Sequence, residues 1–282
     1  MPDRANIPHL LTLLDDDSDF VRENVQHALL EYGPYLEKDL IPFYDHLNEQ
    51  QAELIVDICS HLREQEFEAT WLNWLDQKHI HKALEQAMSR LAYLEYGYSI
   101  PQLEQYLNEL AHTFMFAGLA NEPSQLMTFV FDLQKFGPPQ GDHHHPRLAN
   151  LLHVIRTRQG DQTSLGILCM LLGCRLGIQL YGLSLPDTFL LVSYENNSIK
   201  LYDPYDEGAP MAVSLTSEIL ENIRQQKGPV KSIHSSTEDI LLDVLRTRIN
   251  RHKGRNEYQQ MEVYVRKFET LMFEIQQRTL VA

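Results

Sequence analysis

Residues 147–208 read RLANLLHVIRTRQGDQTSLGILCMLLGCRLGIQLYGLSLPDTFLLVSYENNSIKLYDPYDEG. The apolar spacing in the middle of this stretch predicts a helix with almost no polar face. One face would carry Leu165, Leu168, Cys169, Leu172 and Leu176, and the opposite face Met170, Leu171 and Cys174. A helix with almost no polar face is expected to be buried all round. Thr163 or Ser164 can cap its start. Gly166 and Gly173 each cost about 1 kcal/mol of helix stability relative to alanine, so their presence predicts the close approach of a neighbouring element.

Three short apolar runs follow this helix, at residues 178–183, 188–194 and 199–202. Turn-forming pairs separate them, Pro186-Asp187 and Asn196-Asn197, as is typical of strands joined in succession. A buried helix followed by an antiparallel sheet predicts an α+β core within a chain that is otherwise mostly helical.

Five short motifs carry a resemblance to a known family. They are an arginine-rich lead-in at 156–158, a Gly-x-x-x-Ser-Leu helix start at 160–165, an Arg-Leu-Gly helix end at 175–177, a Pro-x-x-Phe-Leu motif at 186–190 and Asp203-Pro204 after the third strand. Together they resemble the SirB-type branch of the transglutaminase-like superfamily of bacterial proteins. The resemblance spans residues 82–272 and leaves the first eighty residues outside.

The resemblance also implies where catalytic residues would stand. In active transglutaminase-like proteins, a cysteine at the start of the central helix attacks an acyl carbon, a histidine on the following strands takes its proton, and an aspartate orients the imidazole. This chain has Asp161, Gln162, Thr163 and Ser164 at the helix start, with no cysteine, and Thr188 in the place of the histidine, while Asp203 remains. General-base catalysis contributes roughly 10²–10⁴-fold, and a threonine cannot supply it near neutral pH. We therefore expect no catalytic residues, no cofactor, and no transglutaminase or protease activity.

A second hypothesis is a cysteine- or hydroxyl-dependent hydrolase or acyltransferase with a rearranged site. Its residues would be Ser164 or Cys169 as nucleophile, Asp187 as substitute base, and Asp203. Each also has a plain structural interpretation. Cys169 fits an inert core cysteine, and Asp187, beside proline, fits a turn-former. Asp203 fits a residue that ties the strand end to backbone amides.

Histidines and cysteines are the other candidate ligands. His143, His144 and His145 form a run, with His153 further along and His79 and His81 at the start of a predicted helix. Consecutive histidines cannot all face one metal without a strained loop, and no cysteine or carboxylate partner has matching spacing. We expect no metal site here. The three cysteines, Cys59, Cys169 and Cys174, lack paired spacing, which fits a reducing compartment.

The composition excludes several classes of partner. The net charge of -15 argues against nonspecific nucleic-acid binding, which requires clustered lysine and arginine. We interpret the basic run at 147–158 as a solvated helix face. Because no apolar run is long enough to cross a bilayer and the chain opens with charged residues, we expect no membrane contact and a cytoplasmic location.

The amino-terminal residues 7–33 resemble one HEAT-type helical hairpin, with Asp19 as the cap of its second helix, Val21 and Arg22 in its turn motif, and Gly33-Pro34 as its stop. A lone repeat cannot bury its own face, so helices at 36–47, 50–62 and 67–75 are expected to cover it. Further helices are predicted at 80–96, 99–116 and 122–136. After the core, a short helix at 216–224 precedes a hairpin of 237–252 and 256–277, which resembles the tetratricopeptide-like tail of SirB-type proteins.

These patterns divide the chain into a helical HEAT-like region at 1–78, the transglutaminase-like core with its leading helices at 79–215, and carboxy-terminal helices at 216–282. The function that they favour is a non-catalytic protein-interaction or regulatory module with an unidentified protein partner. A structural role in a larger assembly stays open, and the sequence does not determine the oligomeric state.

Overall fold

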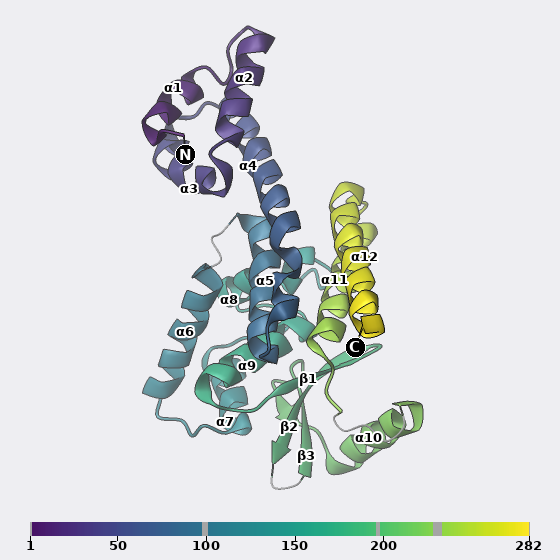
Figure 1. Cartoon of the computed structure of the whole chain (residues 1–282). Helices are drawn as coiled ribbons and strands as arrows, with labels where there is room; N and C mark the ends of the chain where they lie inside the picture. Colours follow the sequence, from purple (N-terminus) through teal and green to yellow (C-terminus); the bar gives the residue numbers. More distant parts are fainter. Residues whose placement is uncertain (1, 98–100, 196–197, 228–232, 282) are drawn as a thin grey trace. The chain divides into compact units, whose positions relative to one another are not determined.

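The computed structural model describes residues 2–97, 101–195, 198–227 and 233–281. The chain forms two compact units, one comprising Met1–Asn73 with Arg90–Ser99 and the other Trp74–Ser89 with Ile100–Ala282 (Figure 1). The turn predicted at 196–197 lies outside the described residues. In the described part of the chain, no helix has both the length and the apolar character needed to cross a bilayer.

The first unit is a small cluster of helices. It contains α1 (Ile7–Thr12), α2 (Asp19–Leu30), α3 (Leu36–Leu40) and α4 (Glu49–Thr70), with short 3₁₀ turns η1 (Arg4–Asn6), η2 (Gly33–Tyr35) and η3 (Ile41–His46). Its core is built by Ile7, Leu11, Leu14, Val25, Leu29, Leu36, Leu40, Ile55, Ile58, Cys59 and Leu62. The first two predicted helices are therefore present, and α3 and α4 contribute to the core that covers them.

Three details of this unit differ from the sequence-based prediction. Asp19 does not cap α2, because Ser18 is the cap residue and Asp19, inside the helix, pairs with Arg22. The helix expected at 36–47 ends at Leu40, since Pro42 has no amide hydrogen to donate and the chain continues as 3₁₀ turns. The helix expected at 67–75 is instead the end of α4, followed by η4 (Trp71–Asp76), because residues 62–67 contain neither glycine nor proline to interrupt the helix.

The second unit combines a layer of helices with one sheet. Its helices are α5 (Ile80–Tyr96, of which residues 90–96 belong to the first unit), α6 (Pro101–Phe116), α7 (Pro123–Met127), which continues as the π-helix η5 (Thr128–Leu133), η6 (Pro146–Ala149), α8 (Leu151–Thr157), α9 (Gln162–Leu176), α10 (Val213–Lys227), α11 (Thr237–Gly254) and α12 (Tyr258–Val281). The strands are β1 (Tyr181–Leu185), β2 (Thr188–Glu195), β3 (Ser198–Asp203) and β4 (Ala209–Pro210). All neighbouring strands are antiparallel, in the order β1-β2-β3-β4. The α+β class is confirmed, although β4, with two residues, is too short to leave an alternating pattern.

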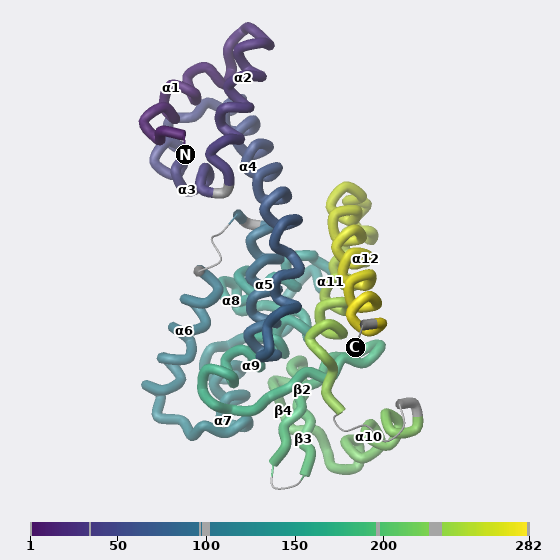
Figure 2. The backbone as a smooth tube through the Cα atoms, in the orientation of Figure 1, coloured from purple at the N-terminus to yellow at the C-terminus, as the bar shows by residue number. Residues whose placement is uncertain are grey.

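The sheet has apolar side chains on both faces, which explains why β2 is a continuous apolar run. Phe189 points toward α9, where its ring meets Gly166. On the other face Leu190 and Val192 pack with Ile223 of α10. Figure 2 follows the backbone from α9 directly into the β1–β2 hairpin. Strand β2 thus lies between two helices, and this arrangement fixes the start of α9 beside the strand ends.

Helix α9 is the centre of the second unit, as its composition predicts, but it is not buried all round. Its residues are buried from Ser164 to Gly173, whereas Cys174 is exposed in the last turn. Arg175, beside it, pairs with Glu85 at 2.6 Å. The predicted close approach at the glycines is confirmed, since a Cβ on Gly166 would lie 2.4 Å from the Phe189 ring.

The arginine-containing segment before α9 is only partly a solvated face. Arg147 and Arg156 are exposed, as expected, whereas the apolar residues between them, Leu148, Leu151, Leu152, Val154 and Ile155, are buried. Arg158 ends α8 in the left-handed conformation with φ 63°, and its guanidinium lies 4.4 Å from the centre of the Phe136 ring. Part of this basic run therefore packs as core and does not form a free positive surface.

The C-terminal hairpin forms as predicted, with each helix longer than expected. Helix α11 begins with a capping box in which Ser236 and Asp239 satisfy each other's backbone amides. Helices α11 and α12 lie side by side (Figure 1). Within the hairpin the guanidinium of Arg248 is fully buried, donating to the hydroxyl of Tyr264 at 3.2 Å and to the carbonyl of Ala149 at 2.8 Å. This arginine therefore joins the hairpin to the segment that precedes α8.

Candidate functional site

The start of α9 meets the beginning of β2 and the end of β3, and the side chain of Gln162 connects them. Gln162 is the first residue of α9, and its amide nitrogen donates to Asp203 Oδ1 at 2.7 Å. Its amide oxygen accepts from Thr188 Oγ1 and from the backbone amide of Phe189, both at 3.2 Å. The structure therefore brings together Thr188 and Asp203, two of the predicted positions, through Gln162, which was expected at the helix start but not among the site residues.

Asp203 also organises the loop that follows β3. The same oxygen, Oδ1, accepts the backbone amide of Tyr205 at 2.8 Å, and the carbonyl of Asp203 accepts the amides of Asp206 and Gly208 at 3.2 and 2.9 Å. Gly208 has φ +68°, and a Cβ there would lie 2.6 Å from the ring of Phe131. The carboxylate is thus held between one side-chain donor and one turn amide.

Ser164 and Thr163 occupy the first turn of α9 but do not join this cluster. The hydroxyl of Ser164, 2% exposed, donates to the carbonyl of Leu148 at 2.7 Å. Thr163 is half-buried, and the void beside both residues has no room for a water molecule. The hydroxyl of Ser164 is therefore directed to a backbone carbonyl in a closed space.

The residue that caps α9 is Asp161, and neither Thr163 nor Ser164 has that role. Asp161 Oδ1 accepts the amide of Ser164 at 2.6 Å, so the cap lies two residues before Thr163 and three before Ser164, the two predicted caps. Its other oxygen lies 2.8 Å from Nη1 of Arg251 in α11, and both side chains are almost completely buried. Burial, followed by the negative charge of Asp161, raises the pKa of nearby Tyr205. Tyr205 is therefore protonated at neutral pH and is not a base.

The alternative nucleophile and base lie apart. Cys169 is fully buried, and burial raises the pKa of its thiol far above the usual value. It lies seven residues beyond Gln162, about 10 Å further along the helix. Asp187 lies in the exposed turn between β1 and β2. The structure does not place these two groups together.

The histidine run forms an ordinary turn. The amide of His144 donates to Asp142 Oδ1 at 3.0 Å, Nδ1 of His145 accepts the amide of Arg147 at 3.2 Å, and Asp142 pairs with Arg255 at 2.7 Å. Burial, and then the charges of Arg255 and Arg147, lowers the pKa of His145. In the ranges that the structure describes, no group of three or more histidine, cysteine, aspartate or glutamate side chains could hold a metal ion.

Removing the charge of Asp161 tests how α9 is anchored to α11. The variant Asp161→Asn keeps a good cap residue but loses the ion pair with Arg251, so we expect the free energy of unfolding to fall by about 2 kcal/mol. Urea denaturation followed by circular dichroism measures it. The matched control Glu274→Gln removes the exposed pair with Arg278 and is expected to cost less than about 0.5 kcal/mol. Equal, small effects of the two substitutions would contradict this role.

A buried helix whose first turn meets two strands of an antiparallel sheet defines an α+β domain. A family model described as the transglutaminase-like superfamily (Transglut_core2) matches residues 78–246, and the chain belongs to this superfamily. The match covers α9, the sheet and the first half of α11.

One curated relative is a UPF0162 protein from Xylella fastidiosa (strain 9a5c), 28% identical over 100 residues. The alignment covers 36% of this chain and 34% of the relative, so the chain spans about a third of that protein. No solved structure matches the chain.

Proposed function

We propose that this protein is a non-catalytic member of the transglutaminase-like superfamily that acts as a protein-interaction or regulatory module. The observation that carries the proposal is the hydrogen-bonded cluster of Gln162, Thr188 and Asp203 at the start of α9. In acyl transfer a nucleophile must lie beside a base that is itself held in place. A primary amide is neither a nucleophile nor a base near neutral pH.

The hydroxyl groups near this cluster support the same proposal. Thr188 donates its hydrogen to the Gln162 oxygen, and Ser164 donates to the Leu148 carbonyl. Neither hydroxyl therefore faces a group that can remove its proton. The amide of Gln162 lies between the helix and the strands and forms hydrogen bonds with Thr188, Phe189 and Asp203. We propose that it thereby occupies the place that a substrate carbonyl would need.

The first unit supports the part of the proposal that concerns a partner. Three of its large apolar side chains are strongly exposed within this unit, Phe20 at 75%, Ile41 at 64% and Val56 at 57%. We take these three side chains to be parts of one binding patch, because a contiguous exposed apolar patch is typical of protein-binding surfaces. We place the binding surface in the HEAT-like hairpin and the helices that cover it.

We further propose that the chain belongs to the SirB-type branch of the superfamily and that the α11–α12 hairpin is its tetratricopeptide-like tail. We also propose a division into three regions, with boundaries after residues 78 and 215, and a cytoplasmic location. The motifs at 160–165 and 186–190 are what support the branch assignment.

A surface substitution tests the partner surface. The double variant Phe20→Ser with Ile41→Ser is expected to weaken partner binding at least about tenfold, because central apolar anchors carry most of the energy of an interface. The matched control Phe273→Ser with Leu280→Ser removes equally exposed apolar groups from α12 in the second unit. The measurement is quantitative in-cell crosslinking with mass spectrometry, comparing the recovery of each partner. Partner recovery that is unchanged by the first variant, or reduced equally by both, would contradict the assignment.

A further inference from the structure

The negative charge of the protein is concentrated in the first unit. This unit contains 17 acidic and 5 basic residues, a net charge of -12, whereas the second unit contains 22 and 19, a net charge of -3. An excess of one sign on a small unit creates a field that attracts partners of the opposite sign. The first unit therefore attracts basic groups and repels the phosphates of nucleic acids.

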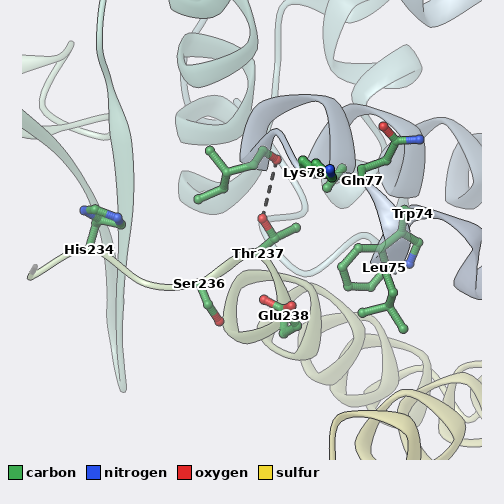
Figure 3. A pocket seen from close by; sticks show the side chains of 10 residues that line it. Trp74, Leu75, Gln77, Lys78, His234, Ser236, Thr237 and Glu238 are labelled. Carbon is green, nitrogen blue, oxygen red and sulfur yellow. Dashed lines mark hydrogen bonds between the residues drawn. The ribbon is translucent and has the colours of Figure 1, made fainter. Parts of the chain in front are cut away.

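The second unit, in contrast, mixes the two signs on its surface. Figure 3 shows an example, a hollow whose lining includes Lys78 from the connection before α5 and Glu238 from the first turn of α11. On α12, Arg278 pairs with Glu274 at 2.9 Å. Opposite charges on an open surface weaken each other's field, so they select no class of partner.

The excess of negative charge is plainest on one face of α4. Four exposed acidic residues follow one another at intervals of four, four and seven residues, which places them on one side of the helix: Glu49, Glu53, Asp57 and Glu64. The only lysine or arginine in α4 is Arg63, which is half-buried and pairs with Glu37. The exposed face of α4 therefore carries charge of a single sign.

The stability of α4 does not explain this acidic face. Glu49 lies in the first turn, where the helix dipole favours a negative charge. Glu53 is four residues from both Glu49 and Asp57, however, and like charges at this spacing destabilise a helix. Among the residues that the structure describes, Glu53, Asp57 and Glu64 form no ion pair. These three carboxylates are therefore available to a partner.

Apolar side chains are exposed among the charges. Val56, 57% exposed, is three residues after Glu53 and next to Asp57. On α2, Phe20, 75% exposed, is three residues before the exposed Glu23. Residues three apart in a helix are neighbours on its surface. Both helices thus present an apolar side chain beside a carboxylate, which a face that is merely solvated does not require.

We propose that the first unit binds a basic amphipathic segment of a partner protein, in which lysine or arginine alternates with apolar residues. This proposal rests on the interaction module proposed above and specifies the chemistry of its partner. The cations of the segment face Glu53, Asp57 and Glu64, and its apolar side chains cover Val56. A metal ion or a polyamine would neutralise the carboxylates but leave Val56 in water, and an uncharged apolar segment would leave the carboxylates without counter-charges.

The test is a titration of the full-length protein with three fluorescently labelled helical peptides of equal length, followed by fluorescence anisotropy. One peptide is an amphipathic helix of leucine and lysine, the second has glutamate in place of lysine, and the third has alanine in place of leucine. We expect the leucine–lysine peptide to bind at least about tenfold more tightly than either of the others. Equal binding of the alanine–lysine peptide would indicate attraction of any polycation, equal binding of the leucine–glutamate peptide would indicate an apolar surface without charge selection, and either result would overturn the proposal.

A charge variant locates the binding face. The triple variant Glu53→Gln, Asp57→Asn and Glu64→Gln is expected to weaken binding of the leucine–lysine peptide about tenfold, because three attractive charges are lost. The matched control Glu218→Gln, Glu262→Gln and Glu269→Gln changes the net charge equally through exposed residues of α10 and α12, and it should change the affinity less than about twofold. Equal weakening by the two triple variants would show attraction by net charge alone and would overturn the assignment to α4.

In-cell crosslinking separates this proposal from the interaction module on which it rests. The α4 triple variant should lose the same partners as the double variant Phe20→Ser with Ile41→Ser. If the Phe20 and Ile41 variant loses partners and the α4 variant keeps them, the basic segment is wrong and the interaction module stands. If neither variant loses partners, both proposals are wrong.

Discussion

Replacing Gln162 by cysteine together with Thr188 by histidine is expected to create a thiol that alkylates about tenfold faster at pH 6 than an ordinary exposed thiol. The introduced thiol would lie at the first position of α9, where the side chain of Gln162 now reaches both Thr188 and Asp203. A helix amino terminus and an adjacent histidine lower a cysteine pKa from about 8.5 to as little as about 3.5–7.5. The thiolate fraction at pH 6 then rises about a hundredfold, and the lower nucleophilicity of a less basic thiolate reduces that gain by a factor of about ten.

The measurement is the rate of modification by iodoacetamide between pH 5 and 9, read for each cysteine by mass spectrometry. The exposed Cys174 serves as the internal reference in the same molecule. The single variant Gln162→Cys separates the effect of the helix from that of the introduced histidine and is expected to show a smaller increase. If the double variant alkylates at pH 6 no faster than Cys174, the positions are not arranged as in an active site, and the assignment of Thr188 is wrong.

Gly166→Ala is expected to reduce the free energy of unfolding by about 3 kcal/mol, although alanine favours a helix. The added Cβ would lie 2.4 Å from the ring of Phe189, which is 2% exposed and also lies against Gly182 of β1. Because the ring is enclosed on both sides, it cannot move without disturbing β2, and overpacking of this kind costs about 1–3 kcal/mol or more. Denaturant unfolding measures the change.

A second substitution identifies the cause. Phe189→Leu in the Gly166→Ala background should recover about 1–2 kcal/mol relative to the sum of the two single changes, because a smaller side chain leaves room for the methyl group. The matched control Gly254→Ala adds a Cβ to α11 where no atom lies within 4 Å, and it should be neutral or stabilising by up to about 1 kcal/mol. Additive effects of Gly166→Ala and Phe189→Leu would contradict a direct contact.

The class of the fold could be predicted from local sequence patterns, because the positions of apolar residues show which faces of each helix and strand are buried. The apolar helix at 162–176 and the apolar run of β2 both follow from packing against two neighbours, and this packing leaves a periodic or continuous pattern. Gly166 was recognisable because a helical glycine is costly unless something approaches it. Three features were not predicted, because each depends on only a few residues. They are the short strand β4, the end of α3 before Pro42 and the extension of α4 to Thr70.

The arrangement of the candidate site was harder to predict than the fold. Thr188 and Asp203 were found by their positions in family motifs, and the structure shows that one side chain contacts both. Gln162 was expected at the helix start but was not chosen as a site residue, because a glutamine there has no catalytic chemistry of its own. Its long side chain nevertheless reaches two strands. The burial of Cys169 was predicted from the apolar helix that contains it, whereas the hydrogen bond from the Ser164 hydroxyl to the Leu148 carbonyl is a tertiary contact that no local pattern indicates.

The absence of an activated nucleophile at the start of α9 is the central claim, and covalent labelling of the native protein tests it most directly. The protein is treated separately with iodoacetamide and with a fluorophosphonate serine probe from pH 5 to 9, and the modified residues are read by mass spectrometry. We predict that Ser164 stays unlabelled and that Cys169 reacts only after denaturation, while the exposed Cys174 reacts in both states. Rapid labelling of Ser164 or Cys169 in the native protein, lost on denaturation, would contradict the non-catalytic assignment.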